Sequence, residues 1–178
     1  MTIDPKFAKS VTTQEYTKKN SIEGVELINY PIFADDGGHF TELIRLDDSG
    51  FAQSTATPFA VKQMSMSYIY NGAIKAFHLH YKQDDLWFVP PSDTLLVNLH
   101  DLRVDSPTYD QHMRLTLGMG KPILLRIPAG VAHGAGNLYG RPMILFYATS
   151  NQFNAAEPDE HRLPWDTFGA QVWELTKG

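Results

Sequence analysis

The chain has 178 residues, 43% of them hydrophobic and 20% charged, and its formal net charge at pH 7 is -5. This length suits one domain with a sizeable core, and the mildly acidic charge argues against a nucleic-acid-binding surface. Because cysteine is absent, thiol catalysis, disulfides and thiolate metal sites are excluded. No apolar run approaches the roughly 18 residues of a membrane span, and the N-terminus lacks a signal-peptide core. We therefore expect a cytoplasmic protein that contacts neither membrane nor nucleic acid.

The N-terminal part of the chain carries few strand signals. Residues 1–22 are polar and lysine-bearing, and we expect an irregular arm or a short helix there. Residues 25–30 have the composition of a strand, which Pro31 ends. A glycine-rich turn in residues 33–45 leads into a short strand, as in a hairpin corner, and a loop follows it.

From residue 59 the sequence consists of short alternating segments separated by turn signals, with hardly any helical periodicity. This pattern indicates an antiparallel sandwich or barrel. The aromatic tail, residues 157–175, has no clear period, and we expect it to cover a barrel mouth rather than to form a domain. The strands are expected within residues 59–70, 73–81, 85–91, 94–104, 113–118, 122–128 and 143–150.

Two stretches hold most of the candidate chemistry. In residues 72–85, His78 and His80 are two positions apart on an expected strand, which points both imidazoles to the same face. In residues 128–137, a Pro-x-Gly turn precedes His133. That side chain would reach the same interior if both segments line one barrel.

A carboxylate could join the three histidines, because Asp84 and Asp85 follow His80 closely in the sequence. Histidines from two strands together with a carboxylate form a sound ligand set for a divalent first-row metal ion. A metal-dependent protein would use His78, His80, His133 and either Asp84 or Asp85.

These two stretches resemble the two cupin motifs. The first has a glycine, five residues and an HxH pair, with an aspartate where the pattern usually has glutamate; the second is PxGxxHxxxN, matched in full from its proline. The resemblance implies an all-β, single-domain cupin, a double-stranded β-helix jelly roll. It would occupy residues 23–178, after an N-terminal arm in residues 1–22 and with the C-terminal segment as a cover.

A closer resemblance, over about residues 24–175, is to the dTDP-4-dehydrorhamnose 3,5-epimerase family. The segments DDGGHFTEL, KAFH, DLRVDSPTYD, RIPAGVAHGAGNL and LFYATSNQF follow one another in the family's order. The resemblance implies a metal-free homodimer, and we expect its N-terminal strands to cross to the partner. The implied substrate is a nucleotide-linked 4-keto-6-deoxy hexose, epimerised at C3, C5 or both without a cofactor.

The resemblance also implies roles for single residues. The histidine that closes the family's RGLH motif is its general base and matches His78, and the tyrosine of its FxYK motif is the acid on the opposite sugar face and matches Tyr147. Histidine is suited to removing a carbon-bound proton near neutral pH, and tyrosine can return one. The enolate formed between these steps needs donors aimed at its oxygen, and we expect His133, His80 and Lys82 to support it.

Some family residues are replaced in this chain. Gly38 and Lys75 stand where the family has two arginines that hold the nucleotide diphosphate, and the family's lysine after the base corresponds roughly to Asp85. The family's aspartate that pairs with the base lies in a C-terminal tail that this chain is expected to lack. The expected substrate contacts are Gln63, Lys75, His80, Lys82, Glu42 and Arg103.

Three other functions stay open from the sequence. The HLH pair resembles the HxH motif of cupin 3,4-ketoisomerases that act on the same sugars. A metal-dependent isomerase or oxygenase would hold one divalent first-row metal ion at His78, His80, Asp84 and His133. The third open function is a sugar-binding cupin that has lost catalysis, since several residues of the family are replaced in this chain.

Overall fold

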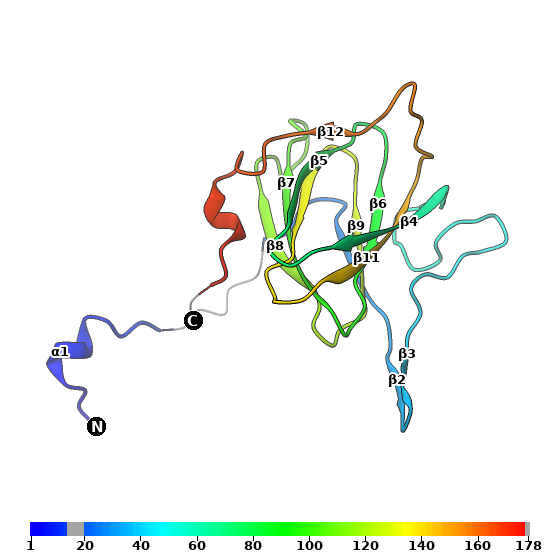
Figure 1. Ribbon diagram of the computed structural model, residues 1–178. Coiled ribbons are helices and arrows are strands. Elements are labelled where there is room, and N and C mark those ends of the chain that lie inside the picture. Colours follow the sequence, from blue (N-terminus) through cyan, green and yellow to red (C-terminus); the bar gives the residue numbers. More distant parts are fainter. Residues whose placement is uncertain (14–19, 177–178) are drawn as a thin grey trace.

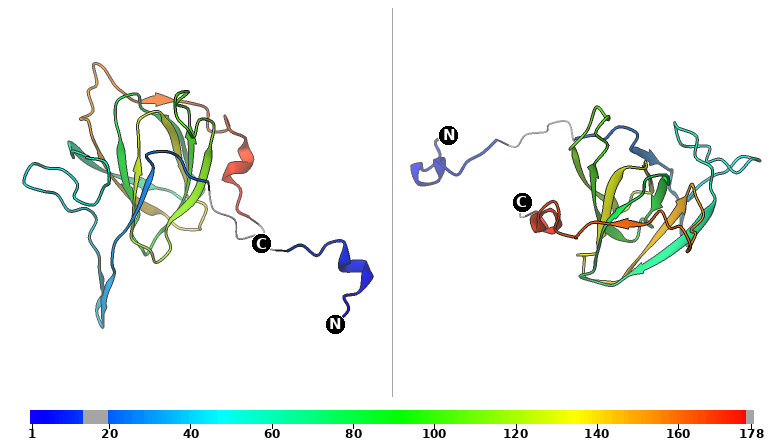
Figure 2. Two further views of the ribbon diagram at one scale, coloured as in Figure 1. Left: turned by 180° about the vertical axis from the view of Figure 1, so that it is seen from behind. Right: turned by 90° about the horizontal axis from the view of Figure 1, so that it is seen from above.

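The computed structural model describes residues 1–13 and 20–176 (Figure 1). The described chain is almost entirely β, and two five-stranded antiparallel sheets pack against each other in a jelly roll (Figure 2). This confirms the expected all-β class and jelly-roll architecture.

The two sheets are built from strands distant in sequence, as the Greek-key connections of a jelly roll require. The first has the order β1 (Glu26–Asn29), β9 (Ile123–Ile127), β6 (Asp85–Phe88), β11 (Met143–Thr149) and β4 (Gln63–Ile69). The second has the order β12 (His161–Arg162), β5 (Ile74–Leu79), β10 (Val131–Gly136), β7 (Thr94–Asp101) and β8 (His112–Gly118).

The other elements are short. A hairpin of β2 (Phe33–Asp35) and β3 (Gly38–Phe40) projects from the body (Figure 1). The chain also has a one-turn helix α1 (Pro5–Ala8) and a 3-10 helix η1 (Ala170–Trp173). Residues 14–19, part of the expected N-terminal arm, lie outside the described residues. No helix among residues 1–13 and 20–176 has the length and apolar character to cross a membrane.

Strand β7 explains why the second sheet is covered on both faces. Leu95, Val97 and Leu99 point into the core between the sheets and are fully buried, whereas Leu96 points to the outer face. Apolar side chains on both faces of a strand require cover on both sides. On the outer face this cover comes from Trp173.

The C-terminal tail therefore covers more than a mouth of the barrel. Only residues 157–162 lie at the rim of the cavity described below, and the rest of the tail packs along the outer face of the second sheet (Figure 2). There Trp173 contacts Phe77, with a ring-centroid distance of 5.4 Å. A Cβ at Gly134 or Gly136 would meet the indole at 3.0 Å, which explains the small residues of β10. These glycines also weaken the strand signal of β10 in the sequence.

Candidate active site

A cavity of about 600 Å³ opens between the two sheets. Strands β5 and β10 pair with His78 opposite His133, so that the two sequence stretches with candidate histidines meet. Strands β6 and β11 face them from the other sheet. The lining includes His78, His80, His133, Asp85, Trp87 and Tyr147.

His78 is held by two charged side chains of the tail. Its Nδ1 lies 2.6 Å from Oε1 of Glu160, and its Nε2 accepts a hydrogen bond from Nη1 of Arg162 at 3.0 Å. Because a carboxylate accepts hydrogen bonds, the proton of the neutral imidazole belongs on Nδ1 and the lone pair on Nε2. The hydrogen bond with His78 lowers the pKa of Glu160, although partial burial opposes this effect. Glu160 therefore stays ionised beside the ring.

His80 is buried, and a second part of the tail fixes its ring. Its Nδ1 donates to the main-chain carbonyl of Asp159. The Asp159 carboxylate in turn accepts hydrogen bonds from the backbone N–H groups of Tyr81, Lys82 and Gln83 at 2.9, 2.8 and 3.0 Å. Burial alone would raise the pKa of Asp159, but these three hydrogen bonds lower it. The Nε2 of His80 is left without a proton in this tautomer.

His133 has the same arrangement on β10. Its Nδ1 donates to the carbonyl oxygen of Val131 at 3.0 Å, and only 2% of the residue is exposed. Burial lowers the pKa of His133, against the opposing effect of Asp85, so the ring is neutral at pH 7. The edge-on contact with Trp87, at a centroid distance of 5.2 Å, fixes the ring plane.

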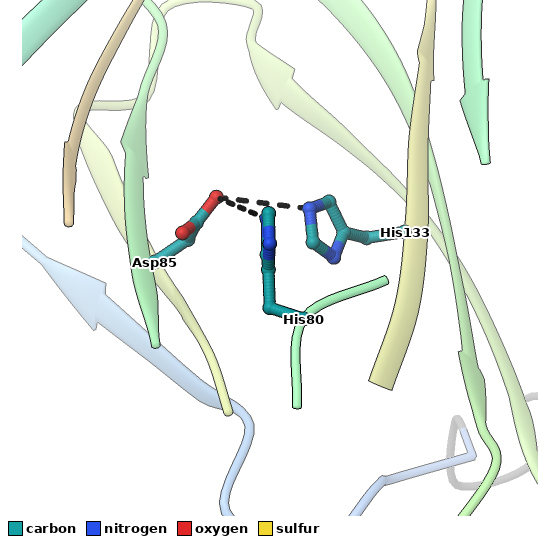
Figure 3. A group of neighbouring side chains, drawn as sticks. All are labelled: His80, Asp85 and His133. Carbon is teal, nitrogen blue, oxygen red and sulfur yellow. Dashed lines mark ion pairs between the residues drawn. The ribbon is translucent and has the colours of Figure 1, made fainter. Parts of the chain in front are cut away.

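One carboxylate oxygen faces both buried rings. Oδ2 of Asp85 lies 3.6 Å from Nε2 of His133 and 3.9 Å from Nε2 of His80, and Figure 3 shows the three side chains pointing toward one another. One ligand atom from each residue lies within 4.8 Å of the others. Asp85 itself is held by hydrogen bonds from Gln83 and Trp87, at 2.9 and 3.1 Å.

Asp84, the other carboxylate considered, does not join this group. Its side chain pairs with Arg126 at 2.5 Å and accepts from the backbone N–H of Ala129 at 2.8 Å. Neighbouring residues of an extended chain point to opposite sides, so only one of the two aspartates reaches the cavity. The structure thereby corrects the expected metal-ligand set, since Asp85 takes the place of Asp84. His78 also lies outside the three-residue group.

Most of the expected substrate contacts lie at or near this cavity. Lys75 lines it and donates to Ser67 at 3.0 Å. Tyr147 lines it from β11 and also borders an adjoining hollow of about 620 Å³. Gln63 and Lys82 line only that second hollow.

Glu42 and Arg103 line neither hollow. Glu42 pairs with Arg45. The Arg103 guanidinium binds the buried carboxylate of Asp101 with both Nε and Nη2 at 2.8 Å, and Nη2 also donates to the carbonyl of Glu23 at 2.7 Å. Within the described residues, Nε and Nη2 of Arg103 hold the corner between β7 and β8, and its contact with substrate stays a prediction.

Three residues at this site were not anticipated from the sequence. Asp159, Glu160 and Arg162 reach the two histidines because β12 pairs with β5, with Arg162 opposite His78. We call residues 157–162 the strap, since they line the cavity and the adjoining hollow. Figure 1 shows β12 running beside β5 at the end of the barrel. A run of charged residues in an otherwise aromatic tail was the only signal for them in the sequence.

Comparisons with known proteins identify the family of this chain. A sequence model of the dTDP-4-dehydrorhamnose 3,5-epimerase family matches residues 19–173. The spore coat polysaccharide biosynthesis protein SpsL of Bacillus subtilis (strain 168) is 43% identical over 145 residues, which are 82% of this chain and 91% of that protein. The probable low-salt glycan biosynthesis epimerase Agl13 of Haloferax volcanii is 28% identical over 146 residues, covering 82% of this chain and 90% of that protein.

A solved structure extends the agreement to the fold. The crystal structure of a dTDP sugar isomerase from Desulfovibrio desulfuricans G20 superposes with a TM-score of 0.69 and 26% identity, covering 87% of this chain and 91% of that one. The family model matches nearly the whole chain, and the match with SpsL covers 82% of it. The chain therefore belongs to the dTDP-4-dehydrorhamnose 3,5-epimerase family.

Proposed function

We propose that this protein is an isomerase that epimerises a nucleotide-linked 4-keto-6-deoxy hexose at C3, C5 or both. The observation that carries the proposal is the geometry of His78. Its Nδ1 is tied to an ionised carboxylate, and the residue lines the cavity together with His133 and Tyr147. A histidine held in this way is suited to general-base catalysis near pH 7.

The first step is removal of the proton from the carbon next to the ketone by Nε2 of His78. The imidazole becomes an imidazolium, and the Glu160 carboxylate stabilises the new charge at 2.6 Å. Arg162 now donates to the same Nε2, so this guanidinium must move aside when the sugar binds. Once displaced, it is available to a negatively charged group of the substrate, such as the diphosphate.

The second step is return of a proton to the other face of the carbon. Tyr147 lies on β11, in the sheet opposite β5, so the sugar ring would lie between it and His78. Only protons move in this reaction, and the adjacent ketone accepts the electrons of the broken C–H bond. Epimerases of this family are cofactor-independent, and we propose that this chain needs no organic cofactor either.

The remaining expected contacts are assigned by position. His80 and His133 form one wall of the cavity, but both donate their Nδ1 protons to main-chain carbonyls, so in this tautomer neither ring offers the enolate oxygen a donor. Lys75 borders the sugar. Gln63 and Lys82 line the adjoining hollow, where the nucleotide would extend. A cation and a side-chain amide there are suited to phosphate and base contacts.

We also propose a cytoplasmic homodimer whose N-terminal strands cross to the partner. The support is exposed apolar surface: Phe33 and Phe40 on the β2–β3 hairpin are 58% and 63% exposed, and Met64 and Met66 on the edge strand β4 are 53% and 56% exposed. An edge strand with apolar side chains is suited to pairing with another chain.

The test is incubation of metal-stripped protein with nucleotide-linked 4-keto-6-deoxy sugars in deuterated water, followed by mass spectrometry and proton NMR. The proposal expects deuterium at C3 or C5 with the 4-ketone retained, and none with His78→Ala. A product whose ketone has moved from C4 to C3 would show that the protein is a 3,4-ketoisomerase instead. Label that forms only after a divalent metal is restored would overturn catalysis by side chains alone. If the protein binds the sugars but incorporates no deuterium, it is a sugar-binding protein without catalysis.

A further inference from the structure

Three lone-pair-bearing atoms meet in the buried wall of the cavity. His80 and His133 both donate their Nδ1 protons to main-chain carbonyls, so both present an unprotonated Nε2 to the same Oδ2 of Asp85. Three such atoms repel one another unless a positive charge lies between them. The hydrogen bonds recorded for residues 1–13 and 20–176 give neither Nε2 a donor.

The surroundings add negative charge. Oε2 of Glu160 also lies 3.9 Å from Nε2 of His80. Arg162 lines the same cavity, but its guanidinium is engaged with Glu160 at 3.2 Å and with His78 at 3.0 Å. Two carboxylates that face two imidazole nitrogens together favour a bound cation.

We propose that His80 Nε2, His133 Nε2 and Asp85 Oδ2 bind one divalent first-row transition ion, with Zn²⁺ as the simplest case. Imidazole nitrogen and carboxylate oxygen bind zinc at about 2.0–2.2 Å, which places tetrahedral ligand atoms about 3.3–3.6 Å apart. The separations from Oδ2 are 3.6 and 3.9 Å, and all three ligand atoms lie within 4.8 Å of one another, so the side chains would have to move inward to complete the site. The side facing the cavity would stay open to water.

The outer contacts of the three ligands match those of a metal site. Ligating histidines generally donate their second nitrogen to a carbonyl or carboxylate, and ligating carboxylates are themselves hydrogen-bonded. Both features are present: each ring donates to a main-chain carbonyl, and Asp85 accepts from Gln83 and Trp87. The strap reinforces His80, since Asp159 is fixed by three backbone N–H groups.

The proposed site shares no ligand with the proposed base. His78 uses both ring nitrogens, with Glu160 and Arg162, and does not belong to the converging group. Metal binding and proton abstraction are therefore separable properties of neighbouring side chains. When bound, the ion would supply a fixed positive charge on the cavity wall.

The test measures binding without any sugar, on untagged full-length protein. Elemental analysis after purification without chelator, and calorimetric titration of EDTA-treated protein with Zn²⁺, should both give one ion per chain. Asp85→Asn and His133→Gln should weaken binding by at least about 100-fold, because altering even an outer contact of a metal site costs 10- to 100-fold. His78→Gln is the matched control and should retain the wild-type Zn²⁺ affinity within about twofold.

A measurement on the wild type keeps the proposal testable if a variant fails to fold. Of the seven histidines, only the Nε2 resonances of His80 and His133 should shift to metal-bound values when Zn²⁺ is added. Failure of the wild type to take up stoichiometric metal would overturn the proposal, as would equal loss of binding in His78→Gln. Zn²⁺ binding is measured without substrate, and deuterium exchange into the sugar is measured without metal. Failure of the metal-site proposal can therefore be told apart from failure of the proposed epimerase function.

Discussion

The Glu160 carboxylate lies 2.6 Å from Nδ1 of His78, although 82 residues separate the two in the chain. Glu160 is thus the carboxylate partner of the proposed base, and it comes from the strap. Such a pair fixes the tautomer of His78 and would supply negative charge to the imidazolium formed during proton removal.

We predict that Glu160→Gln lowers kcat by at least about 100-fold while KM changes little, because an amide neither enforces the tautomer nor stabilises the imidazolium. Glu160→Asp should recover part of the rate. The control is Glu174→Gln, an exposed glutamate farther along the tail, which should match the wild type. A Glu160→Gln enzyme with wild-type kcat would show that Glu160 does not act through His78.

Removal of the Arg162 guanidinium should weaken substrate binding. We predict that Arg162→Gln raises KM for the nucleotide sugar about 10-fold and weakens inhibition by the free nucleoside diphosphate equally, because a charge-assisted bidentate contact to phosphate is lost. Arg162→Lys should recover only part of this affinity, since lysine lacks the planar fork. Steady-state kinetics at two salt concentrations measure both effects, and an unchanged KM in both variants would contradict the assignment.

Tyr147→Phe separates the two proton transfers. The variant retains His78, so it should still exchange the carbon-bound proton for deuterium, while formation of the inverted product falls more steeply. Time courses of label and product in deuterated water measure the two rates on one sample. If the variant matches the wild type in both deuterium exchange and product formation, Tyr147 is not the acid.

Asp101 should govern acid stability. It is fully buried, and burial alone would raise its pKa, but hydrogen bonds from Arg103, Ser106 and Thr108 hold the pKa well below its ordinary range. A lowered folded-state pKa gives stability that is complete above the ordinary aspartate pKa of about 3.9 and is lost as the pH falls below it.

Asp101→Asn should therefore lower the free energy of unfolding at pH 7 by about 3–5 kcal/mol, the typical cost of breaking a buried ion pair. It should also flatten the decline in stability between neutral and acidic pH. Urea unfolding across that range measures both, with Asp110→Asn, an exposed neighbour, as the control. A cost under about 1 kcal/mol would show that the corner network is dispensable.

Much of the fold follows from period-two alternation in the sequence, and the placement of His78 and His80 on the cavity side follows from the same rule. The choice between Asp84 and Asp85 could not be made, because a one-residue difference in where β6 begins reverses which carboxylate faces inward. The roles of Glu160 and Arg162 were also hidden. They depend on the pairing of β12 with β5, a long-range contact of two residues with no local sequence signature.

The small size of β12 has a further consequence. The strap contains only the two-residue strand β12, which lies at the edge of its sheet with both side chains exposed, yet the strap contacts His78 and His80. Segments with few buried contacts open at lower free energy than the core. We predict that the enzyme loses activity at a urea concentration below its global unfolding midpoint, and that the amides of the β12–β5 pairing exchange before those of β7. We therefore expect the proposed catalytic residues to lose their arrangement before the core unfolds, which would leave the jelly roll as an inactive barrel.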